Sequence, residues 1–156
     1  WSVNLDNPSG GWTTQTALPF SRNHIAGATL GGKIYLIGGQ AGSDDARPAS
    51  DVLAWDPAQP DHWTAVANLP QPRSHAAAVT LNGRLVVLAG GTTGDTPLSS
   101  VISYDPATNT WSPMTSLPVA RLAPTAAIAD GRLIFVGGYF GNIRAETFVA
   151  EVASDS

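Results

Sequence analysis

Residues 69–91 read LPQPRSHAAAVTLNGRLVVLAGG, and this stretch decides the fold. A run of small and apolar residues at 76–81 is followed by Asn-Gly at 82–83 and by a second apolar run at 84–88. Asn-Gly pairs favour the positive φ of a two-residue turn, and β-branched runs favour strands. The stretch therefore predicts a β-hairpin that ends on the Gly-Gly doublet at 90–91.

The same markers recur three times along the chain in one fixed order. The Gly-Gly doublets are spaced by 52 and 47 residues and the tryptophans by 51 and 48, which indicates an internal repeat of about 50 residues. An aromatic-Asp-Pro unit occurs at 55–57 and 104–106. The other markers are Leu-Pro at 18–19, 69–70 and 117–118, Arg22, Arg73 and Arg121, Gly-Gly at 38–39, 90–91 and 137–138, and Trp12, Trp63 and Trp111.

Each repeat predicts four short antiparallel strands. An inner strand of small residues is followed by a tight turn and by a second strand of β-branched and aromatic residues. A loop of variable length leads to the third strand, an Asp-Pro turn follows it, and the fourth strand carries the spaced tryptophan. We expect inner strands at 25–30, 76–81 and 125–129, second strands at 33–37, 84–88 and 132–136, and third strands at 52–55, 101–104 and 147–151.

This pattern resembles the kelch repeat, with an arginine before the inner strand, a Gly-Gly doublet, an aromatic-Asp-Pro turn and a spaced tryptophan. The third copy departs from it, because Ala150-Glu151 replaces the aromatic-Asp pair and no tryptophan strand follows. The resemblance implies an all-β fold, a β-propeller of four-stranded antiparallel blades. We expect the third and fourth strands of a partial blade at 1–17, full blades at 18–68 and 69–116, and three strands of an unfinished blade at 117–156.

About three blades are too few to close a ring, since propellers begin at about four. The chain therefore resembles half of a six- or seven-bladed kelch domain, an open half-propeller. Because the first residue is Trp1 rather than Met, we expect a processed or excised piece. Open strand edges favour pairing with another chain, so a head-to-tail homodimer could complete a six-bladed ring. The alternative is that the other half lies outside this chain.

One face of the predicted fold is the candidate binding surface. Strands that alternate in direction place the loop entering each inner strand and the loop after each Gly-Gly doublet on the same side. Arginine presents paired donors that suit carboxylates or sugar hydroxyls. We expect a protein or glycan ligand to be bound by Arg22, His24, Arg73, His75, Arg121, Tyr139, Asn142 and Arg144. The alternative is a structural role, in which the arginines donate to carbonyls of the neighbouring blade and the histidines have their hydrogen-bonding groups satisfied between blades.

A pair of carboxylates, Asp44-Asp45, lies in the first of the long loops. Gly, Ser and Pro flank the pair, so a merely solvated loop is the ordinary interpretation. The other interpretation is a cation or substrate contact.

Composition excludes several classes of function. The formal net charge of −4 argues against a nucleic-acid binder, and no apolar run approaches the ~18 residues of a membrane-spanning helix. With no cysteine, the chain has neither disulfides nor thiolate metal sites. Because no catalytic or phosphate-binding motif is present either, we expect no metal and no cofactor.

Two functions of different class stay open. The first is a non-catalytic binding or scaffolding propeller, and the second is a carbohydrate-active enzyme that resembles the sialic-acid mutarotases. Galactose oxidase also has kelch-like blades, but its cysteine-linked tyrosine cofactor cannot form without cysteine. Acid–base chemistry would fall to Glu146 and Glu151, the two glutamates of the chain. Few charges and abundant small residues lead us to expect a secreted or periplasmic protein.

Overall fold

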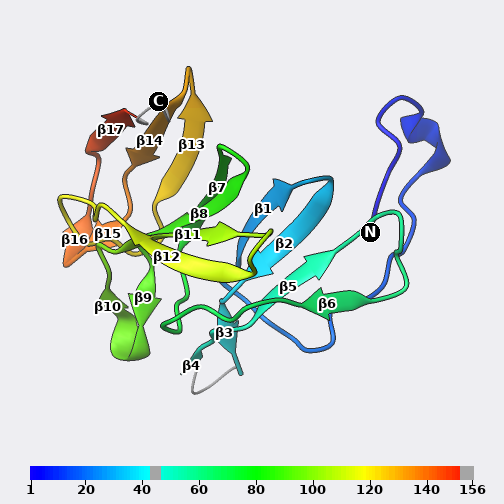
Figure 1. Ribbon diagram of the computed structural model, residues 1–156, viewed down its shortest axis with the longest axis horizontal. Helices are drawn as coiled ribbons and strands as arrows, with labels where there is room; N and C mark the ends of the chain where they lie inside the picture. The colour runs from blue at the N-terminus through cyan, green and yellow to red at the C-terminus, as the bar shows by residue number, and fades with distance from the viewer. Residues whose placement is uncertain (43–46, 152–156) are drawn as a thin grey trace.

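A computed structural model describes residues 1–42 and 47–151 and has three antiparallel sheets that fan out as propeller blades (Figure 1). In each sheet the strands step outward in chain order from the inner strand. Blade 1 contains β1 (Ala26–Leu30), β2 (Lys33–Ile37), β5 (Val52–Trp55) and β6 (Trp63–Ala65). Blade 2 contains β7 (Ala77–Leu81), β8 (Arg84–Leu88), β11 (Val101–Asp105) and β12 (Thr110–Met114), and blade 3 contains β13 (Thr125–Ala129), β14 (Arg132–Val136) and β17 (Thr147–Glu151).

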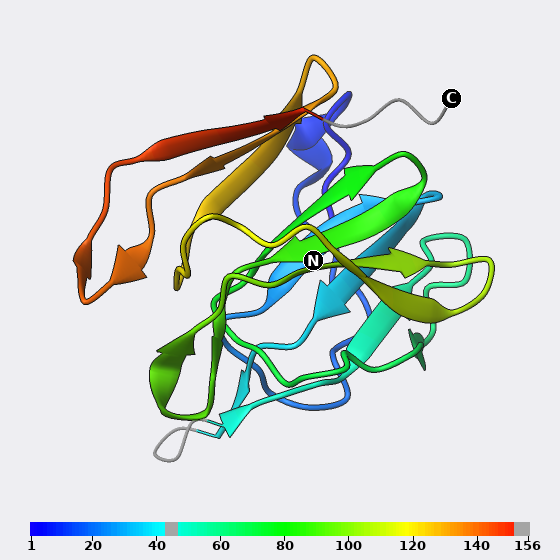
Figure 2. The same cartoon turned by 60° about the vertical axis from the view of Figure 1, so that its left-hand side comes forward.

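A small two-stranded hairpin follows the second strand of every blade, and the three hairpins lie along one side of the molecule (Figure 2). Within the described residues, helical structure is limited to two short 3-10 turns, η1 (Pro8–Gly10) and η2 (Thr93–Asp95), and neither could cross a membrane. The hairpins are β3 (Gln40–Ala41) with β4 (Arg47–Pro48), β9 (Gly91–Thr92) with β10 (Thr96–Pro97), and β15 (Tyr139–Phe140) with β16 (Asn142–Ile143).

The predicted blade strands are confirmed to within a residue or two. The inner strands of blades 1 and 2 begin one residue later than expected, at Ala26 and Ala77. The three two-residue turns have positive φ as predicted; Asn82 and Asp130, for example, have φ of 47° and 49°. Residues 1–17 differ, because the two expected strands are reduced to one antiparallel bridge between Ser2 and Thr13. Pro8, Gly10 and Gly11 interrupt this segment, and no further strand of the described chain pairs with it.

The hydrophobic core lies between the blades. Alternate residues of β8 face opposite ways, so Leu85 and Val87 join a cluster with Tyr35 of blade 1. Val86 and Leu88 join a second cluster with Leu133 and Phe135 of blade 3. The second strand of blade 2 is therefore buried on both faces.

Two of the spaced tryptophans link their blade to the chain segment before it. The indole N–H of Trp111 donates to the carbonyl of Ala67 at 2.8 Å, and that of Trp63 donates to the carbonyl of Thr16 at 3.3 Å. Trp12 differs because its side chain is mostly exposed. Two of the three spaced tryptophans therefore have a structural role in the described chain.

Candidate ligand-binding face

The loops that enter the inner strands and the three small hairpins form one surface, which we call the loop face. A backbone bridge joins the two loops within every blade: Asn23 with Gln40, Ser74 with Gly91, and Leu122 with Tyr139. The alternation of strand directions therefore places these segments together as predicted.

The bridges also show which residues are equivalent between blades. Gly38, Ala89 and Gly137 each donate a backbone N–H to the residue that precedes the third strand. Ala89, with φ of 60°, therefore occupies a position that is glycine in the other blades, and the structural doublet of blade 2 is Ala89-Gly90. This corrects the alignment on Gly90-Gly91 by one residue, and the doublet spacings become 51 and 48, equal to those of the tryptophans.

Glycine at the second doublet position is required by the entering loop of the same blade, which lies too close to leave room for a Cβ. A Cβ on Gly90, whose φ is 88°, would lie 2.6 Å from the carbonyl oxygen of Ser74. The Gly39 N–H donates to the carbonyl of Arg73 at 3.0 Å, and the Gly90 N–H donates to that of Arg121 at 2.9 Å. The doublets of blades 1 and 2 are thus bonded to the entering loop of the next blade.

Arg73 is buried, with 2% of the residue exposed. Its Nη1 donates to the carbonyls of Ala89 at 3.1 Å and Ser100 at 3.3 Å, and its Nη2 donates to the hydroxyl of Ser100 at 2.9 Å. Burial lowers the pKa of the guanidinium to about 10, which leaves it charged at neutral pH. All of these acceptors belong to its own blade, whereas the structural alternative expected carbonyls of the neighbouring blade.

The arginines of the other two blades have carboxylate partners. Arg22 Nη2 lies 2.5 Å from Asp51 Oδ2, and Arg121 Nη2 lies 3.3 Å from Glu146 Oε2. Asp51, Ser100 and Glu146 are equivalent, since each directly precedes the third strand of its blade. This placement favours the structural interpretation of the three arginines, and their contact with a ligand stays a prediction.

His24 and His75 stack on one another at the junction of blades 1 and 2, with ring centroids 3.8 Å apart. The backbone N–H of His75 donates to the backbone carbonyl of His24 at 3.1 Å, and both residues have positive φ. Burial, followed by the charge of His24, lowers the pKa of His75. The structure therefore brings these two predicted site residues together, and they link neighbouring blades.

The hairpin β15–β16 carries the remaining predicted site residues and is the most apolar of the three hairpins. Tyr139 is 46% exposed, Phe140 47% and Ile143 91%. Asn142 is exposed beside them, and Arg144 Nη2 donates to the Phe140 carbonyl at 3.1 Å. This hairpin is therefore an exposed apolar surface that is stabilised at its base by an arginine.

Two of the residues on this hairpin surface were not among the predicted site residues. Phe140 and Ile143 were missed because the prediction followed polar side chains, although the composition of the loop differs visibly from the Gly- and Thr-rich loop of blade 2. Asp44-Asp45 lie outside the described residues. Among the residues that are described, no group of three or more metal-ligating side chains could hold a metal ion.

Nearly the whole chain is similar in sequence to known proteins. A family model described as the KLHDC2/KLHL20/DRC7 Kelch-repeats domain matches residues 4–151. Kelch-like protein 33 of Homo sapiens is 37% identical over 132 residues, which cover 83% of this chain and 24% of that protein. Kelch repeat and BTB domain-containing protein 13 of Homo sapiens is 36% identical over 132 residues, covering 83% and 28%.

A more distant relative comes from an invertebrate. Alpha-scruin of Limulus polyphemus is 31% identical over 134 residues, which cover 83% of this chain and 14% of that protein. The chain thus spans less than a third of the length of each of these three relatives.

Proposed function

This chain belongs to the kelch-repeat family, and from that premise we propose that it is a protein-binding module that recognises a partner segment through the loop face. The observation that carries the proposal is the exposed apolar hairpin β15–β16. Aromatic side chains and arginine are enriched where protein interfaces concentrate their binding energy. Tyr139 and Phe140 on the hairpin and Arg144 directly after it provide these residue types within six residues.

The rest of the loop face supports this assignment by its rigidity. The entering loops of blades 2 and 3 are bonded to the doublets of the preceding blades, and the arginines are bonded inside their own blades. A rigid surface loses little conformational entropy when it binds, which favours affinity. The loop face therefore presents a fixed platform with one apolar projection.

The enzymatic alternative has less support from the two glutamates. Glu146 is paired with Arg121 and Arg144, and Glu151 lies 3.9 Å from Arg132. Hydrogen bonding from its own backbone N–H and then the two arginines hold the pKa of Glu146 below its ordinary value. A carboxyl with a lowered pKa is a poor general acid near neutral pH. We therefore favour binding over catalysis.

A displayed library of random peptides tests the proposal. We expect peptides selected on this chain to lose about tenfold or more in affinity for the Phe140→Ser variant, which removes a central aromatic contact. Met114→Ser is the matched control, because Met114 is similarly exposed but lies on β12, the outer strand of blade 2, and not on the hairpin β15–β16. Peptides that bind the Phe140→Ser variant as tightly as the parent chain would exclude the hairpin as the site.

Two expectations from the sequence stay predictions. In the described chain β17 pairs on one side with β14 and is open on the other, which is compatible with ring completion by a second copy. Native mass spectrometry tests this, since a folded monomer would contradict the head-to-tail dimer. Export from the cell also stays a prediction.

A further inference from the structure

A cavity of about 460 Å³ opens between blades 1 and 2, at the strand ends opposite the loop face. Its walls come from the turn between β1 and β2, from residues 56–62 after β5, and from the turn between β11 and β12. The volume falls in the range of about 300–1,000 Å³ that is usual for small-molecule sites. None of the predicted loop-face residues lines it, so it is separate from the proposed protein-binding surface.

Two tyrosines form the aromatic part of the cavity. Tyr35 and Tyr104 are buried, and their ring centroids are 6.1 Å apart. The Tyr104 hydroxyl donates to Asn109 Oδ1 at 2.8 Å, and the backbone N–H of Ala67 donates to the same oxygen at 2.8 Å. These two bonds fix the amide of Asn109 and leave its NH₂ donors for a ligand.

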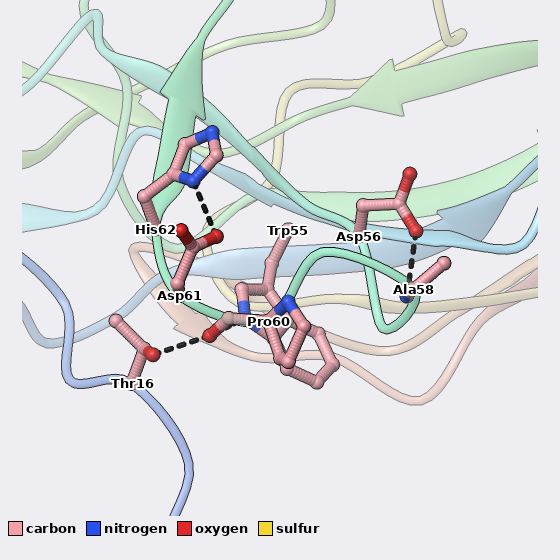
Figure 3. A network of polar contacts seen from close by, with 7 residues as sticks. All are labelled: Thr16, Trp55, Asp56, Ala58, Pro60, Asp61 and His62. Carbon is pink, nitrogen blue, oxygen red and sulfur yellow. Dashed lines mark hydrogen bonds and ion pairs between the residues drawn. The ribbon is translucent and has the colours of Figure 1, made fainter.

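The polar part of the cavity wall contains an ion pair whose two charges cancel. Lys33 Nζ lies 3.3 Å from Asp56 Oδ2. Asp56 Oδ1 accepts the backbone N–H of Ala58 at 2.9 Å (Figure 3). That backbone hydrogen bond, together with Lys33, lowers the pKa of Asp56 and keeps it ionised. His62 also lines the cavity, and its Nδ1 lies 2.7 Å from Asp61 Oδ1 (Figure 3). A donor and an acceptor thus lie side by side while their charges cancel.

The junction of blades 2 and 3 provides an internal comparison. Arg84 and Asp105 repeat the ion pair at 3.0 Å. However, the strand registers place Val86 where blade 1 has Tyr35 and Ala150 where blade 2 has Tyr104. The ion pair is therefore a feature of the repeat, whereas the two tyrosines are particular to the junction of blades 1 and 2.

We propose that this cavity binds a neutral saccharide of one or two rings. A sugar hydroxyl both donates and accepts, so it can bridge the Lys33 ammonium and the Asp56 carboxylate, where an ion would be repelled by one of them. The buried tyrosines form part of the cavity wall, and the partly buried Leu30 and Val66 add apolar surface for the C–H groups of a sugar ring. The Asn109 amide adds fixed donors, and fixed donors favour orientation of a polar ligand.

Titration of the folded chain with neutral mono- and disaccharides, followed by saturation-transfer NMR, tests this proposal. We expect at least one of glucose, galactose, N-acetylglucosamine or lactose to bind. Tyr35→Val, which introduces the residue of the equivalent blade 2 position, and Asp56→Asn should each weaken that binding about tenfold. Asp105→Asn is the matched control and should leave it unchanged. Circular dichroism establishes that each variant is folded, and Asp56→Asn serves if Tyr35→Val does not fold.

Three outcomes would overturn the proposal. They are no saccharide binding up to about 50 mM, binding that both cavity variants retain, or binding of zwitterionic amino acids in place of sugars. The Phe140→Ser variant should bind the saccharide like the parent chain. A failure of peptide binding on the loop face would therefore not contradict saccharide binding in the cavity. A failure of saccharide binding would likewise leave the proposed peptide site untouched.

Discussion

Blade 2 and blade 3 are built on one repeat but depart from it in different places. In blade 2 the departures are Ala89 at a glycine position and Ser100 at a carboxylate position, and both adjoin the buried guanidinium of Arg73. In blade 3 they are Tyr139 and Phe140, which project from the loop face. The equivalent hairpin strand of blade 2 is Gly91–Thr92. A departure inside a blade bears on stability, and a departure on the surface bears on recognition.

The largest expected effect is that of Arg73→Ala. Removing the buried side chain leaves a cavity and unpaired carbonyls, so we expect a loss of about 3 kcal/mol of unfolding free energy and a fall in Tm of about 10 °C. Differential scanning calorimetry measures this. Arg84→Ala is the control, since its half-exposed ion pair with Asp105 should contribute less than about 0.5 kcal/mol. Equal Tm values for the two variants would contradict a structural role for Arg73.

A smaller change in the opposite direction is expected for Ser100→Asp. It gives Arg73 the carboxylate partner that Arg22 and Arg121 have, and a charge-assisted hydrogen bond should add about 1 kcal/mol, or about 3 °C in Tm. Ser100→Asn has a similar shape without the charge and should bring no comparable gain. A lower Tm for Ser100→Asp would contradict the prediction that a carboxylate at position 100 stabilises the chain as a partner of Arg73.

The smallest effect concerns pH at the stacked histidines. Burial and His24 lower the pKa of His75, while the charge of Asp95 opposes this. The unfolded chain therefore binds more protons near pH 6, and stability is lost as pH falls below about 6.5. We expect His75→Asn, which tolerates positive φ, to reduce the fall in Tm between pH 7.5 and 5.5 by on the order of 1 °C. His62→Asn, an exposed histidine, is the control, and an unchanged slope for His75→Asn would contradict this account.

The repeat itself could be predicted from the sequence because its markers are local. Tight turns, small inner strands and spaced tryptophans each require particular residues at fixed spacing, and the strands lie where these residues place them. The doublet spacings of 52 and 47 residues differ by one from the tryptophan spacings of 51 and 48, and this difference already indicated that the doublet of blade 2 begins at Ala89. The loss of the two strands expected in residues 1–17 could not be predicted, because pairing depends on a neighbouring strand that the local pattern does not specify.

The candidate sites were less accessible to prediction. The loop face could be predicted from the alternating strand directions. The burial of the Arg73 side chain could not, because it depends on hydrogen-bond acceptors at Ala89 and Ser100, which lie 16 and 27 residues away. The cavity combines Tyr35 with Tyr104 and Asn109 of the next blade. No local motif marks such a combination, because it arises only when two blades pack together.

The central claim is that the exposed hairpin of blade 3 binds a protein segment while the repeated arginines hold the blades. The most direct test measures Tm and peptide affinity together for Phe140→Ser, using peptides selected on the parent chain. We predict an affinity loss of about tenfold or more with Tm changed by less than about 2 °C. Unchanged affinity, or a loss of affinity that is matched by a large fall in Tm, would contradict the claim.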